Sequence, residues 1–195
     1  MKKSSWLPVT GSPASFARAK FGLRSSLCPA ILVALMVGCE FAYGQSLDEI
    51  NKREEAVREA WEKTPLAVRR ALFVSEEPQG FGIYTPRPSA RFKAGEQMIV
   101  YAEPVGFEWK SLEGGQYEFG LKVDLIVKTA AGKIVVEQDN FGNLVLRSRA
   151  QNREFLVHFD VNFTGAPPGD YLLDFRLRDA EGDKAGMIEL PFTLE

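Results

Sequence analysis

Alternating apolar and polar side chains dominate the second half of the chain. The longest alternation covers residues 117–128, where one side carries Tyr117, Phe119, Leu121, Val123, Leu125 and Val127. A period of two residues is typical of a strand with one buried side and one side in water. The same alternation recurs over 155–163, 171–177 and 188–194. The pattern therefore predicts four long strands.

Short turn-forming sequences separate these segments and add shorter strands. Residues 130–133 predict a hairpin into a strand over 134–138, and residues 179–184 predict the turn into the last strand. Further short strands are expected at 82–85 and 97–103. About seven strands with one-sided alternation are typical of an antiparallel β-sandwich of immunoglobulin-like type. The absence of crossover helices between them disfavours a parallel α/β enzyme fold.

The segment before the strands repeats with a helical period. Ser46 and Glu49 form a capping box, and the apolar stripe that follows is Leu47, Ile50, Val57 and Trp61. Thr64 and Pro65 then favour a new helix start, with a second stripe of Val68, Ala71 and Leu72. We therefore expect two short α-helices between residues 46 and 73. Narrow stripes of this kind favour docking on the edge of a domain over pairing as a coiled coil.

The first 44 residues have the layout of an export signal. Five basic residues and no acidic residue precede Glu40, and an apolar run covers 27–38. That run is shorter than the ~20 residues that a membrane-spanning helix requires, so we expect no transmembrane span. The small residues of Ala42-Tyr43-Gly44 fit the rule for signal cleavage before Gln45.

A second way of processing the export signal remains an alternative. Residues 36–39 resemble the lipoprotein box of bacteria, in which Cys39 would become the lipidated first residue. Ordinary cleavage would release a diffusible protein, whereas lipidation would hold it on a membrane. In both cases we expect an exported protein, periplasmic or extracellular. The chain then divides into an export signal (1–44), a helical segment (45–79) and a β-sandwich domain (80–195).

Charge and cysteine usage narrow the classes of partner and chemistry. The whole chain has a formal net charge of −2, and five of its 24 basic residues but only one of its 26 acidic residues lie in the first 44. Removal of the signal would therefore leave a mildly acidic protein. Basic residues are scattered among acidic ones, so we expect no nucleic-acid partner. Both cysteines, Cys28 and Cys39, lie in the leader, which leaves the rest of the chain no thiol for a disulfide, zinc cluster or nucleophile.

One segment resembles a known domain family. Residues 167–175, Pro-Pro-Gly-Asp-Tyr-Leu-Leu-Asp-Phe, are similar to the loop and strand near the carboxyl end of immunoglobulin-like and fibronectin-III-like domains. The resemblance implies that Tyr171 occupies the tyrosine corner, with its hydroxyl bonded back to the loop backbone. As a whole, the chain resembles exported bacterial proteins that carry such a sandwich behind a signal peptide. That resemblance implies a fold and no particular activity.

Residues 81–110 contain more aromatic side chains than the core of such a domain requires. They combine aromatic and arginine side chains with three prolines, and such residues on stiffened loops provide large contact area at low entropic cost. We therefore expect a protein or glycan partner to bind there, with Arg87, Arg91 and Trp109 as the exposed members. Buried aromatic residues of the core would give part of the same pattern.

The chain carries no catalytic signature, and we expect neither a cofactor nor a metal. Its only histidine, His158, would lie about 6.5 to 7 Å from Asp160 on one strand face, too far for an orienting hydrogen bond. A hydrolase or metal-assisted enzyme centred on His158, with Asp124 from a neighbouring strand, is the alternative. A purely structural envelope spacer is a third hypothesis. The acidic turn at 179–183 resembles a calcium loop but lacks its closing glutamate.

Overall fold

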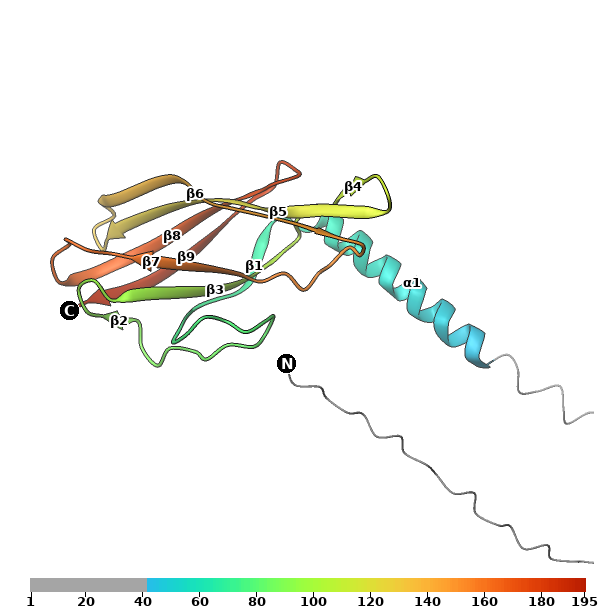
Figure 1. Ribbon diagram of the computed structural model, residues 1–195, viewed down its shortest axis with the longest axis horizontal. Helices are drawn as coiled ribbons and strands as arrows, with labels where there is room; N and C mark the ends of the chain where they lie inside the picture. Colours follow the sequence, from blue (N-terminus) through green and yellow to red (C-terminus); the bar gives the residue numbers. More distant parts are fainter. Residues whose placement is uncertain (1–41) are drawn as a thin grey trace, which may run out of the picture. The chain divides into compact units, whose positions relative to one another are not determined.

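The computed structural model describes the backbone of residues 42–195 and the side chains of 46–195, and this part of the chain is mainly β (Figure 1). The predicted signal run at 27–38 and Cys39 lie outside these residues. Within them, no helix combines the length and the apolar character that crossing a membrane requires. The elements are α1 (Ala42–Lys63), β1 (Ala67–Val74), β2 (Arg91–Phe92), β3 (Gln97–Val105), β4 (Lys110–Leu112), β5 (Gln116–Thr129), β6 (Ile134–Ser148), β7 (Val157–Asn162), β8 (Gly169–Asp179) and β9 (Ala185–Leu194).

The strands form two sheets. A three-stranded sheet has the order β1-β3-β7, and a six-stranded sheet has the order β2-β9-β8-β5-β4, with β6 paired to the other edge of β5. Every pairing is antiparallel except that of β2 with β9, which is parallel. The prediction of a mainly β chain whose strands run largely antiparallel is therefore confirmed.

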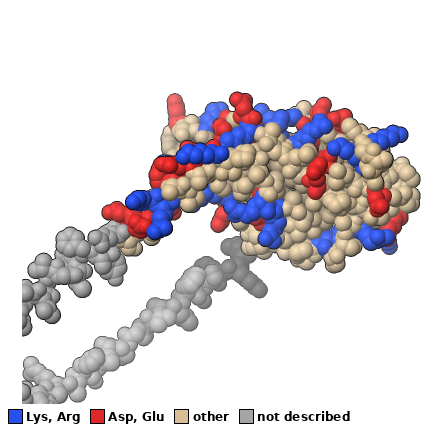
Figure 2. Space-filling model, turned by 180° about the vertical axis from the view of Figure 1, so that it is seen from behind, with Lys and Arg blue, Asp and Glu red and all other residues tan. Residues whose placement is uncertain are grey.

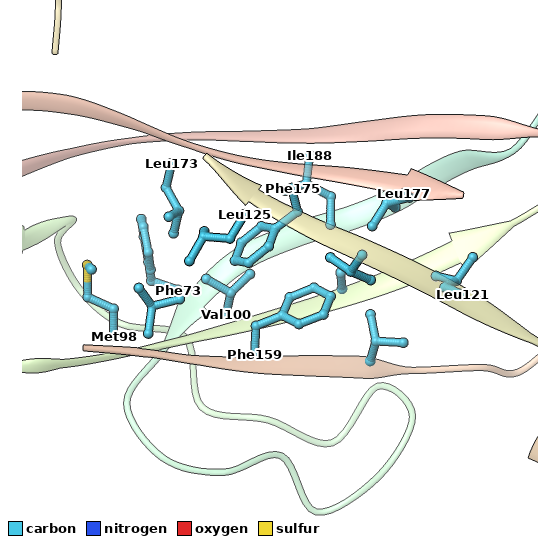
Figure 3. Close-up of a cluster of buried hydrophobic side chains, with 14 of the residues drawn as sticks. Phe73, Met98, Val100, Leu121, Leu125, Phe159, Leu173, Phe175, Leu177 and Ile188 are labelled. Atoms are coloured by element: carbon cyan, nitrogen blue, oxygen red, sulfur yellow. The ribbon is translucent and has the colours of Figure 1, made fainter. Parts of the chain in front are cut away.

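The apolar sides of the two sheets face each other and form the core (Figure 3). Phe159 of β7 stacks on Phe175 of β8 with ring centroids 4.3 Å apart, so the two sheets touch directly. Val123 and Leu125 of β5 alternate with outward-facing residues and are buried on the same inner side. The arrangement is compatible with a β-sandwich, in which side chains from two inner faces interdigitate.

The predicted second helix is wrong, because residues 67–74 form strand β1. Helix α1 ends at Lys63, where the Thr64 hydroxyl donates to the Ala60 carbonyl at 2.7 Å. Pro65 disfavours helical geometry in the residue before it and supplies no backbone N–H, so it stops the helix here and does not start another. The apolar stripe expected for a helix instead contributes to β1, whose pairing with β3 contains a bulge between Val68 and Arg70.

Residues 82–85, expected as a strand, lie in a loop that covers the outer face of the three-stranded sheet (Figure 1). Only isolated bridges occur near them, at Gly80 with Ile83 and at Val74 with Pro86. Tyr84 packs on Tyr101 of β3 at a centroid distance of 4.3 Å. Burial beneath this loop raises the pKa of Tyr101 to about 12, and its hydroxyl donates to Glu103 at 2.9 Å. The loop thus buries two polar side chains that an open sheet face would leave in water.

Strand β6 is longer than expected because it continues through a bulge. Its register with β5 shifts between Val123 and Leu125, and Asn140 adopts the left-handed conformation at φ 52°. The buried carboxylate of Asp124 accepts the Asn140 backbone N–H at 2.8 Å and a hydrogen bond from Arg178 of β8 at 2.9 Å. The Asn140 N–H, followed by Arg178, lowers the pKa of Asp124 below its usual value. One buried carboxylate therefore accepts a backbone N–H of the bulge, at a residue with no Cα partner in the register with β5.

The loop bond expected from the Tyr171 resemblance is present. The Tyr171 hydroxyl donates to the Pro167 carbonyl oxygen at 2.7 Å, while its ring is buried against Phe192 and Phe163. The turns expected at 130–133 and 179–184 also connect the strands they were predicted to connect. These features depend on short-range sequence signals, which explains why they could be foreseen.

The depressed pKa of Asp124 predicts a pH-dependent contribution to stability. A carboxyl whose folded pKa lies below its unfolded value stabilises the fold above the unfolded pKa, and this contribution is lost as pH falls through the folded pKa. We expect Asp124→Asn to lower the free energy of unfolding by about 2 kcal/mol at pH 7, and by progressively less below about pH 4. Urea denaturation across pH measures this.

Asp139→Asn is the matched control, because Asp139 lies in the same bulge with an exposed side chain. It should change the free energy of unfolding little at any pH. A loss for Asp124→Asn that stayed the same between pH 7 and pH 3 would contradict the role given to the Asp124 charge.

Candidate binding site

An aromatic cluster lies where the end of α1 meets the sandwich. Phe107, which follows β3, is fully buried and packs against Trp61 of α1 at 5.1 Å and Trp109 at 5.5 Å between ring centroids. It also stacks on Phe119 of β5 and contacts Phe155, both at 5.4 Å between ring centroids. The cluster therefore joins the helix to the core of the sandwich through one ring.

Hydrogen bonds fix both tryptophans of this cluster. The Trp61 indole N–H donates to the Phe107 carbonyl oxygen at 2.8 Å, and the Trp109 indole N–H donates to the Asn152 carbonyl oxygen at 3.0 Å. The two indole rings stack at 5.3 Å with an interplanar angle of 27°. Because buried indole N–H groups need a partner, these bonds define the orientation of each ring. Trp109 stays half-buried, whereas Trp61 is 8% exposed.

The backbone at the end of α1 approaches the sandwich closely. Gly106 has φ 80°, and a Cβ added there would lie 2.3 Å from the Pro65 carbonyl oxygen. Lys184, in the turn between β8 and β9, donates to the carbonyl oxygens of Glu62 at 2.9 Å and Gly106 at 2.8 Å. A cation at the carboxyl end of a helix also interacts favourably with the helix dipole. Lys184 thus bonds the helix end and the Gly106 turn together.

A buried carboxylate accepts a hydrogen bond from the segment that follows Gly106. Asp179, at the end of β8, accepts the backbone N–H of Glu108 at 2.7 Å and that of Glu181 at 3.0 Å. Glu181 in turn lies 3.0 Å from the Lys110 ammonium. Two acidic side chains of the 179–183 turn, expected from sequence to resemble a calcium loop, are therefore paired with groups of the chain itself.

A cleft of about 390 Å³ opens between α1 and the connection from β6 to β7, with Trp109 in its wall. Its lining is otherwise polar or charged, apart from one alanine: Asn51, Glu54, Glu55, Arg58, Ala150, Gln151 and Arg153. Arg58 contacts Glu55 across one helical turn, and this hydrogen bond raises the pKa of the guanidinium. The cleft therefore presents amide, carboxylate and guanidinium groups around one aromatic side chain.

A smaller cavity of about 300 Å³ lies against the same aromatic cluster, lined by Glu62, Phe107, Glu108, Trp109, Gln151 and Lys184. Trp109 and Gln151 line both hollows. On the face that Figure 2 displays, basic and acidic side chains are interspersed. That face therefore carries no electrostatic field of a single sign.

The structure does not bring Arg87 and Arg91 together with Trp109. Arg91 is in β2 and contacts Glu195, which follows β9, whereas Trp109 directly precedes β4. β2 lies far from β4 and α1 along the sheets (Figure 1). Arg87 donates to Glu96 at 2.6 Å and lies 4.2 Å from the centre of the Phe92 ring. The Lys93 backbone N–H and Arg87 lower the pKa of Glu96. The Arg87 side chain is therefore bonded within the segment that surrounds β2.

The groups of the alternative enzyme hypothesis lie on opposite sides of the sandwich. His158 is on the outer face of the three-stranded sheet, 3.8 Å from Glu77, and Asp160 accepts from Gln97 at 3.1 Å. Asp124 is on the outer face of the six-stranded sheet and binds Arg178. Among residues 46–195, no group of three or more His, Cys, Asp or Glu side chains is placed to hold a metal ion.

Three residues that position the cleft were not identified as site residues from sequence. The helical period identifies Trp61 only as part of an apolar stripe, although a large aromatic side chain near the end of a helix is a signal that this end docks on another element. The sequence pattern predicts only a turn at Asp179 and Lys184. Their partners, Glu108 and Glu62, lie 71 and 122 residues away along the chain, so no local pattern could reveal these bonds.

No protein-family model matches the chain, and a search of curated proteins finds none that is similar to it.

The close approach at Gly106 predicts a large effect of a single methyl group. Gly106→Ala would place that group against the Pro65 carbonyl oxygen and displace the segment after α1. We expect it to cost at least about 2 kcal/mol of unfolding free energy more than Gly114→Ala. Gly114 is a matched control, since it has φ 75° with nothing within 4 Å of an added Cβ.

Urea denaturation followed by tryptophan fluorescence measures both free energies of unfolding, because unfolding exposes the buried Trp61 to water. Gly114→Ala should show only the cost of left-handed geometry, about 1 to 2 kcal/mol. Equal costs for the two variants would mean that Gly106 does not pack against the end of the helix.

Proposed function

We propose that this chain is an exported, non-catalytic binding module with an immunoglobulin-like sandwich, which takes a glycan in the cleft beside Trp109. The observation that carries the proposal is the cleft itself, in which one half-buried indole stands among amide, carboxylate and guanidinium side chains. The layout of the first 44 residues supports the exported address.

The strand order supports the immunoglobulin-like assignment. In such domains strands A, B, E and D share one sheet, and strands C, F and G share the other. Here β1, β3 and β7 form the smaller sheet, while β5, β8 and β9 lie in the larger one, with β6 added beside β5. The hydrogen bond from Tyr171, near the start of β8, to Pro167 supports the same assignment, because a tyrosine corner lies near the start of strand F.

The chemistry of the cleft favours a glycan over an apolar ligand. A sugar presents hydroxyl groups that both donate and accept, and it packs a C–H face against an aromatic ring. Glu54 and Glu55 supply acceptors, Arg58 and Arg153 supply donors, and Asn51 and Gln151 supply both. An apolar peptide side chain would offer no hydrogen bond to any of these groups, including Glu54, Asn51 and Arg153. Trp109 is held in orientation before any ligand arrives, which limits the entropic cost of binding.

The proposal predicts a specific loss of glycan binding. The full-length chain and its variants are applied to an array of oligosaccharides, including bacterial cell-wall fragments, and in parallel to a peptide array. We expect binding to oligosaccharides, and we expect Trp109→Ala and Glu54→Gln each to weaken it, the former by at least about tenfold. Arg91→Ala at the other end of the sandwich is the control and should bind as the unmodified chain does.

Other results would overturn the proposal. Binding to peptides alone would make the partner a protein, and binding to neither array would favour a structural spacer. Retained oligosaccharide binding in Trp109→Ala and Glu54→Gln, with thermal melts showing folded variants, would place the site elsewhere. Hydrolysis of an oligosaccharide that is lost in His158→Ala would make the protein an enzyme.

A further inference from the structure

The outer edge of β6 is a long strand edge with no partner in the described part of the chain. β6 pairs only with β5, so the backbone groups along its other edge are not bonded within either sheet. Its side chains include four of the nine exposed large apolar residues in that part: Ile134, Val135, Val145 and Leu146. Edges of this kind accept an added strand from another chain.

Charges on β6 are separated along the strand. Glu137 and Asp139 lie in the first half, and Arg147 and Arg149 lie at the end of the second half or just beyond it. All four side chains are exposed. Glu137 and Arg147 point to the same outer face of the sheet, since their partners on β5 are Ile126 and Glu118. Lys133, one residue before β6, is also exposed. Within the strand itself, the edge is acidic in its first half and basic at its end.

We propose that β6 pairs antiparallel with β6 of a second copy of this chain about a twofold axis. Antiparallel pairing places the acidic half of each strand beside the basic half of the other, so that Glu137 can lie opposite Arg147 twice. Cross-strand pairs of opposite charge stabilise a sheet, whereas like charges directly opposite destabilise it. Parallel pairing would bring like charges together. The pattern thus selects an identical strand in the antiparallel direction.

Existing ion pairs do not block this arrangement. Arg147 contacts Glu118 at 2.6 Å and Glu137 contacts Arg176 at 3.5 Å, but the side chains of Arg147 and Glu137 are 65% and 47% exposed. Exposed pairs of this kind contribute little to stability. Each charged side chain can therefore turn toward a partner strand at small cost. The Asn140 backbone N–H is bonded to Asp124 of β5. Residues 136–138 and 142–148 on either side of the bulge keep a regular register with β5, so their outer edge is available for pairing.

The pairing also has a consequence for the proposed glycan site. The chain leaves β6 at Ser148 and reaches the cleft within five residues, at Ala150, Gln151 and Arg153. In an antiparallel pair these two exits lie at opposite ends of the joined strands. The dimer would therefore carry two clefts facing separate points on an extended ligand, which raises the apparent affinity without new contacts.

Two charge-reversed variants test the proposal. One carries Glu137→Arg and Asp139→Arg, so its edge is basic throughout, and the other carries Arg147→Glu and Arg149→Glu, so its edge is acidic throughout. Sedimentation measures the oligomeric state of the full-length chain over a wide concentration range at low and high salt. We expect a monomer–dimer equilibrium for the unmodified chain, weakened at least about tenfold in each variant. Circular dichroism checks that both variants are folded.

The decisive step is to mix the two variants. Their edges are complementary to each other but not to themselves, so the mixture should restore dimers, detected as the mixed mass in native mass spectrometry. Asp160→Arg on β7 reverses a charge on an edge of the other sheet and should dimerise normally. A monomeric unmodified chain, or variants that self-associate as strongly as it does, would overturn the proposal. Failure of two folded variants to pair with each other would overturn it as well.

Discussion

The buried ring of Phe107 is the contact on which the candidate site depends. It packs on Phe119 and Phe155 in the sandwich and on Trp61 in the helix, and its carbonyl oxygen accepts the Trp61 indole N–H. Without this ring, the end of α1 would lose the apolar surface that holds it. The cleft would then lose the wall that carries Glu54 and Arg58. The site is thus formed by docking a helix onto the end of the sandwich.

Two buried carboxylates accept hydrogen bonds from backbone N–H groups in irregular parts of the structure. Asp124 satisfies the backbone of the β6 bulge, and Asp179 satisfies the backbone on the segment that carries Trp109. A buried ionised carboxyl is costly unless charged or backbone donors surround it. In both places the donors are present at 2.7 to 3.0 Å. The β6 bulge and the segment that carries Trp109 therefore depend on polar groups inside the protein as well as on the apolar core.

The sequence was sufficient for the strands that bury one side, because a period of two residues has a direct physical cause there. β5, β7, β8 and β9 were expected close to where they lie. β1 was expected as helix, since its apolar positions fit a helical stripe and only pairing with β3 decides the matter. Pro65 is compatible with both outcomes, because proline can end a helix as well as begin one.

The candidate site was only partly accessible from sequence. The sequence predicts Trp109 as an exposed aromatic residue, and the structure places it half-buried in the wall of the cleft. Arg87 and Arg91 are near Trp109 in sequence but not in the structure. Strand β3 separates them from Trp109, and its nine residues span about 30 Å. The groups that build the cleft come from α1 and from the connection after β6, which only the tertiary structure brings together.

The most direct test of this account is whether Trp61 is docked on Phe107 in solution. Nuclear Overhauser measurements on isotope-labelled protein can detect contacts between the Trp61 indole and the Phe107 and Trp109 rings. We expect cross-peaks from Trp61 to both residues and slow exchange of its indole proton, since that proton is bonded to the Phe107 carbonyl oxygen. An indole proton that exchanges rapidly with water and shows no cross-peak to Phe107 would mean that the helix is not docked and that the cleft does not exist.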